Sequence, residues 1–236
     1  CMFLFSFYTC GLRFGDVFNL LWGNIGVDGI LRVTAEKNYR KLVVKLNPKQ
    51  ANILKYFTPL NSLFQNNFSN RIEVQNELME QFPRISNLID YEIKYLKIRE
   101  KTQPQKYELI QQQFEEFGIY PELVLDDEET KMELQEVYEI RDELLISFLI
   151  SFAENNTHKP IFPFREMKDY KPRELVFKKE ASNTIVNKEL KNVFDDLERP
   201  SVSFHVARHT FANLARLSAD KVGDKSVKWD IYRISR

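Results

Sequence analysis

The sequence predicts an α+β fold that is mainly helical, with one small antiparallel β-hairpin and a helical insertion. Apolar residues recur with helical periodicity over much of the 236-residue chain. Two β-rich runs, 29–36 and 41–46, flank a short polar turn and predict the hairpin. An acidic stretch, 61–157, interrupts an otherwise basic chain. We therefore expect a core built from 1–60 and 158–236, with 61–157 as a separate helical unit.

Helical segments are predicted on both sides of the hairpin. The apolar stretch 1–12 is typical of the end of a helix, with Gly11 near its close. It has no basic leader, so it does not resemble a signal peptide, and it predicts that further chain precedes it. After the hairpin, 48–57 predicts a short helix that Asn47 caps and Pro48 opens.

The net charge of zero conceals two regions of opposite sign. Residues 61–157 hold 20 acidic and 9 basic residues, and the remainder holds 14 acidic and 25 basic residues. The acidic segment therefore has a net charge of −11 and the remainder +11, which argues against DNA contact by the segment. Its helical patterns cover 73–81, 85–101, 106–117 and 128–152. We interpret the segment as an insertion packed on its own host; the alternative is an interaction arm for a second protomer.

Two more helices are predicted after the insertion, over 182–194 and over a stretch that begins at 203. In the second, we expect Phe204, Phe211 and Leu214 to anchor the helix in the core.

His205 and Arg208 stand three residues apart in that helix, so both side chains leave the same face. An imidazole beside a guanidinium suits an anionic oxygen. Arginine offers a fixed fork of donors, and histidine exchanges a proton near neutral pH. Taken alone, the pair is better interpreted as a buried histidine and a surface arginine that meet no ligand.

The longer string around this pair, HVARHTFA at 205–212, resembles the HxxRHTFA box of the tyrosine recombinases, the phage integrase family. CGLRFGDVFNLLW at 10–22 resembles the family's first box, TGLRxxE followed by LxW, and NKELK at 187–191 resembles its NxxLK helix. The resemblance excludes 61–157. It implies the tyrosine-recombinase catalytic fold, with PIFPF at 160–164 in the place of a short aromatic-proline strand.

By this resemblance, Arg13, His205 and Arg208 are catalytic residues. Asp16 stands at an acidic position that supports the site, and His209 is a further supporting residue of the second box. Without that box, Arg13 would be interpreted as a helix-end arginine bonded to nearby carbonyls, and Asp16 as a helix cap.

Lys37 stands where the first strand of the hairpin ends and matches the family's catalytic lysine. The match is incomplete, because Asn38 replaces the usual threonine and Lys45 the usual proline. Arg40 and Lys41 are neighbouring alternatives for the role. A lysine on a hairpin is also often no more than a solvated strand edge.

The family's nucleophilic tyrosine is expected to be missing from these residues, together with its third catalytic histidine. In the family, a GH or a tryptophan stands about 23 residues beyond the arginine, and the tyrosine about nine later. Tyr232 lies 24 residues after Arg208 and only three after Trp229, so the spacing does not fit. We interpret Trp229 as a packing residue and Tyr232 as an ordinary helix residue, with Tyr232 as the alternative nucleophile.

The resemblance implies site-specific DNA recombination or integration by transesterification through a phosphotyrosyl intermediate. The partners would be double-stranded DNA and further copies of the chain assembled on it. The basic remainder suits a protein that binds the phosphate backbone. Two alternatives stay open: a recombinase remnant that binds DNA without cutting it, and an interaction module built on the acidic insertion.

The sequence also argues against several other classes of protein. No run of about 18 or more apolar residues predicts a membrane span. Cys1 and Cys10 would lie roughly 13 Å apart on one helix, which is beyond disulfide reach. Three histidines and two cysteines without CxxC or HExxH spacing do not predict a metal site. We expect a reduced, cytoplasmic protein that needs no metal or other cofactor.

Overall fold

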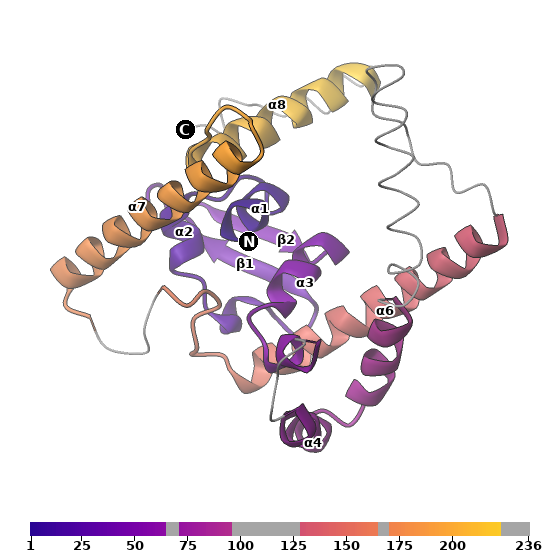
Figure 1. Cartoon of the computed structure of the whole chain (residues 1–236). Coiled ribbons are helices and arrows are strands. Elements are labelled where there is room, and N and C mark those ends of the chain that lie inside the picture. The colour runs from indigo at the N-terminus through magenta and orange to yellow at the C-terminus, as the bar shows by residue number, and fades with distance from the viewer. Residues whose placement is uncertain (65–70, 96–127, 165–169, 223–236) are drawn as a thin grey trace. The chain divides into compact units, whose positions relative to one another are not determined.

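The computed structural model describes residues 1–64, 71–95, 128–164 and 170–222 (Figure 1). These ranges are mainly helical and contain a two-stranded antiparallel sheet, which confirms the predicted α+β class with mostly helix. The helix predicted over 106–117 lies outside the described residues, as do Trp229 and Tyr232. Within the described ranges, no helix is long and apolar enough to cross a membrane.

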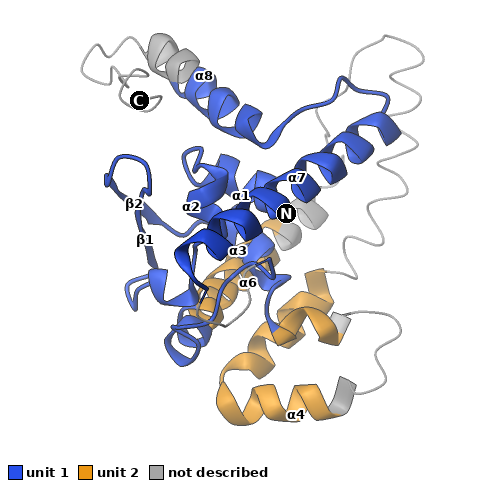
Figure 2. Cartoon of the chain, turned by 90° about the vertical axis from the view of Figure 1, so that its left-hand side faces the viewer, with its two compact units in different colours: residues 1–58, 150–236 blue, residues 59–149 orange. Residues whose placement is uncertain are grey.

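The chain divides into two compact units, which we describe separately (Figure 2). Unit 1 comprises 1–58 and 150–236, and unit 2 comprises 59–149. The sequence predicts divisions after residues 60 and 157, so the second division falls earlier in the structure. It does so because α6 (Glu128–Asn155) is one continuous helix, whose last turns belong to unit 1. Whether unit 2 can be removed as an insertion stays a prediction.

Unit 1 brings together the two ends of the described chain. Besides the end of α6, its elements are α1 (Met2–Tyr8), α2 (Phe14–Phe18), the 3-10 helix η1 (Trp22–Asn24), β1 (Ile30–Thr34), β2 (Lys41–Lys45), α3 (Pro48–Lys55), α7 (Pro172–Asp196) and α8 (Phe204–Val222). The cap predicted for α3 is confirmed. The Asn47 side chain accepts a hydrogen bond from the backbone N–H of Gln50 (3.0 Å), and the Gln50 side chain accepts one from that of Asn47 (2.9 Å).

The predicted hairpin is confirmed, with β1 antiparallel to β2. Leu31 lies opposite Val44, and Val33 lies opposite Leu42, so these four side chains share one face of the ribbon. Leu31 and Val33 are buried, which shows that this face packs on the core. The other face is solvated, and most residues of the turn between the strands are exposed.

Aromatic rings join the segments of unit 1. The ring centroid of Phe162 lies 5.5 Å from that of Phe5 in α1 and 4.8 Å from that of Phe57 after α3. Trp22 meets Phe152 at 4.9 Å, in an edge-to-face contact that ties η1 to the end of α6. Such pairs contribute beyond the area they bury, and they hold the first and last parts of the chain in one core.

The strand expected over 160–164 does not form. Pro160 makes an isolated bridge with Leu21, and the backbone N–H of Ile161 donates to the carbonyl oxygen of Leu20 at 3.0 Å. Pro160 and Pro163 have no N–H to donate, so a regular ladder cannot continue through this segment. The segment is held by the ring of Phe162 instead.

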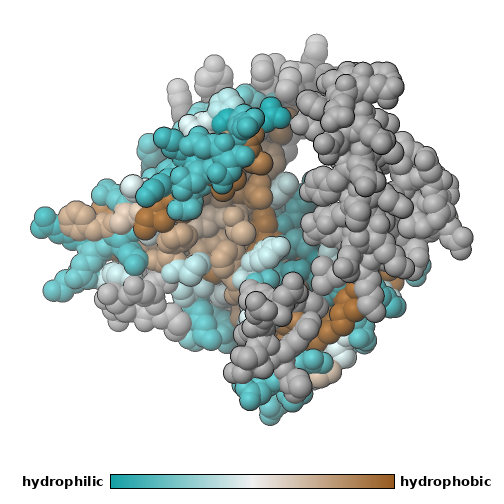
Figure 3. Space-filling view, viewed as in Figure 1, coloured by the Kyte–Doolittle hydropathy of each residue, from teal (hydrophilic) through white to brown (hydrophobic). Residues whose placement is uncertain are grey.

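One of the three expected core anchors on α8 is wrong. Phe204 is buried and Phe211 is half-buried, but Leu214 is 47% exposed. Phe7 in the last turn of α1 packs against Phe211, and α1 ends at Tyr8, so α8 extends past its neighbour before it reaches Leu214. Unit 1 also exposes apolar side chains on α7, including Phe177, and Figure 3 shows hydrophobic patches between the hydrophilic ones.

Unit 2 contains the 3-10 helix η2 (Pro59–Phe64), α4 (Arg71–Gln81), a helical stretch at 85–95 and most of α6. A buried ion pair lies at its centre. Arg141 of α6 contacts Glu92 at 2.8 Å, with both side chains at most 2% exposed, and it also contacts Asp142 at 2.7 Å. The Arg141 guanidinium lies over the ring of Tyr95 as well. These contacts fix the 85–95 helix against α6.

Candidate functional site

Helix α8 begins where a side chain from α7 satisfies its first backbone donor. The backbone N–H of Phe204 donates to the Asn187 side-chain oxygen at 2.7 Å. Asn187 is itself held by Asn183 one turn earlier, through its side-chain nitrogen. The buried ring of Phe204 packs edge-on against Phe14 of α2 (5.2 Å) and Phe3 of α1 (6.3 Å). The start of α8, which carries His205 and Arg208, is therefore held against three other helices.

The loop between α1 and α2 packs directly against Arg208. Cys10 and Gly11 both have positive φ values, 57° and 71°, and they turn the chain sharply after α1. A Cβ atom on Gly11 would stand 2.8 Å from the Arg208 Cα, closer than real Cβ atoms approach backbone. The carbonyl oxygen of Gly11 accepts a hydrogen bond from Arg208 Nη1 at 3.0 Å. The loop therefore needs glycine here, for its conformation and for the close approach of α8.

Arg13 and Asp16 come from the start of α2. Arg13 is the N-cap residue of this helix, in an extended conformation. Asp16 is 5% exposed, and its Oδ1 accepts the backbone N–H of Glu36 at 2.9 Å. The helix-cap interpretation of Asp16 is wrong, because no side chain caps α2. Asp16 instead ties α2 to the turn of the hairpin.

Lys37 lies in that turn, immediately after the backbone contact with Asp16. The preceding residue, Glu36, forms an ion pair with Lys179 of α7, with Lys179 Nζ 2.7 and 2.8 Å from the two carboxylate oxygens. The backbone of Glu36 is thus held from α2 and its side chain from α7. Lys37 is exposed, and the turn presents it beside Arg13.

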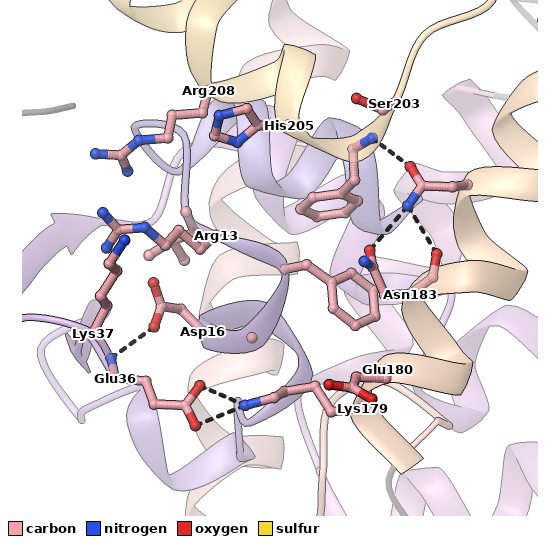
Figure 4. A pocket seen from close by; sticks show the side chains of 15 residues that line it. Arg13, Asp16, Glu36, Lys37, Lys179, Glu180, Asn183, Ser203, His205 and Arg208 are labelled. Atoms are coloured by element: carbon pink, nitrogen blue, oxygen red, sulfur yellow. Dashed lines mark hydrogen bonds and ion pairs between the residues drawn. The ribbon is translucent and has the colours of Figure 1, made fainter. Parts of the chain in front are cut away.

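A pocket of about 510 Å³ brings the predicted residues together. Its lining includes Arg13, Asp16, Lys37, His205 and Arg208. Figure 4 shows the cationic ends of Arg13, Lys37 and Arg208 on the same side of the pocket, with the Asp16 carboxylate near Arg13. These residues come from α2, the hairpin turn and α8, which are far apart in the sequence.

His209 does not line this pocket, and it is exposed on α8 one turn after His205. The two imidazole rings meet edge to face, with centroids 4.4 Å apart. His209 is therefore placed to influence His205 and not to contact a ligand in the pocket. Arg40 and Lys41, the alternatives to Lys37, are also absent from its lining.

The charges of the pocket shift the titration of its own members. Burial lowers the pKa of His205 below its usual 6.5, and electrostatic repulsion from His209, Arg208 and Arg13 lowers it further. Burial and the nearby charge of Arg13 lower the pKa of Arg208, and Asp16 acts in the opposite direction. His205 is therefore neutral at pH 7 and can accept a proton, while the guanidinium of Arg208 keeps its charge.

The arrangement suits an anion with several oxygens. Convergent cations repel one another, and an anion between them removes that repulsion. Guanidinium donors match the geometry of phosphate, and the neutral imidazole of His205 supplies an acid–base group at the same place. Among the described residues, no cluster of three or more His, Cys, Asp or Glu side chains could hold a metal ion.

Three residues position the site in ways that the sequence does not indicate. Asn187 belongs to a helical motif there, yet in the structure it caps α8. Glu36 and Lys179 belong to no motif, although their ion pair spans 143 residues of sequence. For this ion pair, the only signal in the sequence is the position of Glu36 next to Lys37.

Comparison of the chain with models of protein families, with curated proteins and with solved structures finds no match.

Proposed function

We propose that unit 1 is the catalytic core of a tyrosine-type site-specific DNA recombinase and that its pocket binds the scissile phosphate. The observation that supports this most is the convergence of Arg13, Lys37, His205 and Arg208 on one pocket. Two sequence boxes and a hairpin predict these four residues independently of any distance between them. The tyrosine-recombinase fold and the assembly of several copies on double-stranded DNA belong to the same proposal.

The proposed reaction is a transesterification. A tyrosine oxygen attacks the scissile phosphorus, the bond to the 5′-oxygen breaks, and a 3′-phosphotyrosyl link and a free 5′-hydroxyl result. Attack by a 5′-hydroxyl of a second strand reverses the step and releases the tyrosine. No external energy source is needed, because one phosphodiester replaces another.

The pocket residues would have separate roles. Arg13 and Arg208 would hold the non-bridging oxygens, where negative charge develops in the transition state. Lys37 would give a proton to the leaving 5′-oxygen, and neutral His205 would accept one near the nucleophile. Asp16 would keep the α2 end in register with the hairpin turn, through its bond to the Glu36 backbone.

The source of the nucleophile is a question separate from phosphate binding by the pocket. No tyrosine in the described ranges lines the pocket, and Tyr232 lies outside them. A nicked duplex incubated with the protein and analysed on a denaturing gel tests this point. We expect no protein-linked strand, because the spacing of Tyr232 from Arg208 is short for the family. A linked strand that disappears in Tyr232→Phe would identify Tyr232 as the nucleophile.

Duplex binding tests the phosphate pocket itself. Fluorescence anisotropy at several salt concentrations should give a steep fall in affinity, since each neutralised phosphate contributes roughly −0.9 to the log–log slope. Arg13→Ala and Arg208→Ala should each weaken binding about tenfold, or about 1.4 kcal/mol, and make the slope shallower. Arg84→Ala, an exposed arginine of unit 2, is the control of equal charge. A flat salt response, or equal losses in Arg208→Ala and Arg84→Ala, would contradict the proposal.

A further inference from the structure

A second pocket, of about 310 Å³, adjoins the first. The two linings share Leu12, Arg13, Asp16 and Arg208, so these four residues form a common wall. The second pocket continues from this wall to Arg40 and Lys41, at the end of the hairpin turn and the start of β2. The proposed reaction uses only the first pocket and leaves the second unexplained.

Charge distinguishes the two pockets. The lining of the first has four side chains that are cationic at neutral pH and three carboxylates, and the ion pair of Glu36 with Lys179 accounts for one of each. The lining of the second has four such cations, Arg13, Arg40, Lys41 and Arg208, and Asp16 as its single carboxylate. The second pocket is therefore the more strongly positive, and an anion would be attracted to it as well.

Apart from Asn38, the remaining lining of the second pocket is mainly apolar. Phe211 of α8 is held in place by Phe7 of α1, with ring centroids 6.5 Å apart. Val43 is 60% exposed on a strand whose outer face otherwise carries Lys41 and Lys45. Positive side chains beside a small apolar surface suit a nucleotide, whose phosphate is charged and whose sugar presents C–H groups. A bare inorganic anion would leave that surface unused.

The shared wall also suits a continuous nucleic acid strand. Consecutive phosphates of one strand advance by about 3.4 Å along the axis of a duplex. Two pockets that share a wall of four residues are close enough to take neighbouring phosphates. Arg13 and Arg208 would then lie between two bound phosphates and contact both, so the repulsion between these guanidinium groups would be relieved from two sides.

We propose that the second pocket binds the nucleotide that flanks the scissile phosphate on the same strand. Arg40 and Lys41 bind its phosphate, and Phe211 and Val43 contact its sugar. This inference rests on the proposed function, because it takes the first pocket to hold the scissile phosphate. It also gives the hairpin cations different roles, since Lys37 serves the reacting phosphate whereas Arg40 and Lys41 position the strand.

Small ligands test the second pocket without knowledge of the DNA target. We would measure binding of inorganic phosphate, thymidine 5′-monophosphate and thymidine 3′,5′-bisphosphate by calorimetry. The bisphosphate carries two phosphates around one sugar, as a strand does. It should bind about tenfold more tightly than the monophosphate, as expected for one added charge-assisted contact of about 1.4 kcal/mol.

Substitutions on the hairpin locate that advantage. Arg40→Ala with Lys41→Ala should remove the preference for the bisphosphate, which should then bind no more tightly than the monophosphate. Lys45→Ala is the matched control, because Lys45 is exposed on the same strand and lines neither pocket. All three side chains are exposed, so the variants should fold normally.

The outcomes separate this inference from the function on which it rests. The inference is wrong if the wild-type protein shows no preference for the bisphosphate, or if the preference persists in the double variant. Phosphate binding that is lost in Lys37→Ala would still support the first pocket in either case, because Lys37 lines the first pocket and not the second. Phosphate binding that is unchanged in Arg208→Ala would instead contradict the proposed function.

Discussion

Gly11→Ala should destabilise unit 1 more than any ordinary glycine substitution. The change places a Cβ atom 2.8 Å from the Cα of Arg208 and 3.2 Å from its Cβ and Cγ, at a φ of +71°. A left-handed conformation costs an L-residue about 1–2 kcal/mol, and overpacking a close contact costs about 1–3 kcal/mol. The free energy of unfolding should therefore fall by roughly 2–5 kcal/mol.

Two other glycines separate these contributions. Gly29 has a φ of +69°, but a Cβ there meets only the flexible end of Ile150, so Gly29→Ala reports the conformational cost alone. Gly26→Ala has neither a positive φ nor a backbone contact, because its new Cβ meets the ends of Arg32 and Asp28. We expect losses in the order Gly11, Gly29, Gly26.

Urea unfolding followed by tryptophan fluorescence measures these losses. The buried ring of Trp22 reports on unit 1, and a Trp229→Phe background leaves it as the only tryptophan of the chain. If Gly11→Ala costs no more than Gly29→Ala, the close approach of α8 to this loop is wrong. Phosphate binding adds a second measurement, since displacement of α8 moves Arg208 away from the pocket.

Asn187→Ala removes the acceptor for the first N–H of α8 and should lower the free energy of unfolding by about 0.5–2 kcal/mol in the same assay. Asn187→Asp keeps an acceptor and should retain most of the wild-type stability. Equal losses in the two variants would exclude capping as the cause. Glu92→Leu removes the buried carboxylate that contacts Arg141 and should cost up to about 3–5 kcal/mol, since the contact of Arg141 with Asp142 remains. Replacing both partners by leucine should recover much of that loss, whereas additive losses would show that the two side chains are not coupled. Because the pKa of His205 is lower in the folded protein, the unfolded chain binds more protons than the folded chain just below pH 6.5. The contribution of His205 to the free energy of unfolding should therefore fall as the pH drops from 6.5 through the folded pKa. Arg208→Gln should raise that pKa, as read from the imidazole NMR signals, and a downward shift would contradict the electrostatic account.

Local patterns predicted those parts of the fold that depend on neighbours in the sequence. The hairpin follows from two β-rich runs and a polar turn, and the α3 cap follows from Asn47 before Pro48. His205 and Arg208 share a face because they are three residues apart on one helix. In each case the interaction spans only a few residues, so its geometry is set by the local backbone.

Features that depend on distant neighbours could not be predicted in the same way. The apolar pattern of α8 marks Leu214 as inward, but its exposure depends on where α1 ends. The contact of Asp16 with Glu36 joins α2 to the hairpin, and no periodicity encodes such a pairing. The closeness of Gly11 to Arg208 likewise arises only when two helices pack together.

The hydrogen bond between Arg208 and Gly11 spans 197 residues, and this separation has a consequence for how the site forms during synthesis. Unit 2 is a continuous stretch, whereas unit 1 needs both its first and its last described helices. On a ribosome, the α1 and α2 segments must therefore wait with their apolar side chains uncovered until α8 has emerged. Unit 2 can meanwhile complete its own contacts.

The length of the intervening chain matters little once synthesis is complete. Loop closure costs about (3/2)RT ln n, so shortening the separation from 197 to about 106 residues by removing unit 2 would gain only about 0.5 kcal/mol. The penalty of this topology is therefore kinetic. Newly made chains that stall before residue 204 should expose the rings of Phe3 and Phe14, and they should bind chaperones that chains extending past α8 no longer recruit.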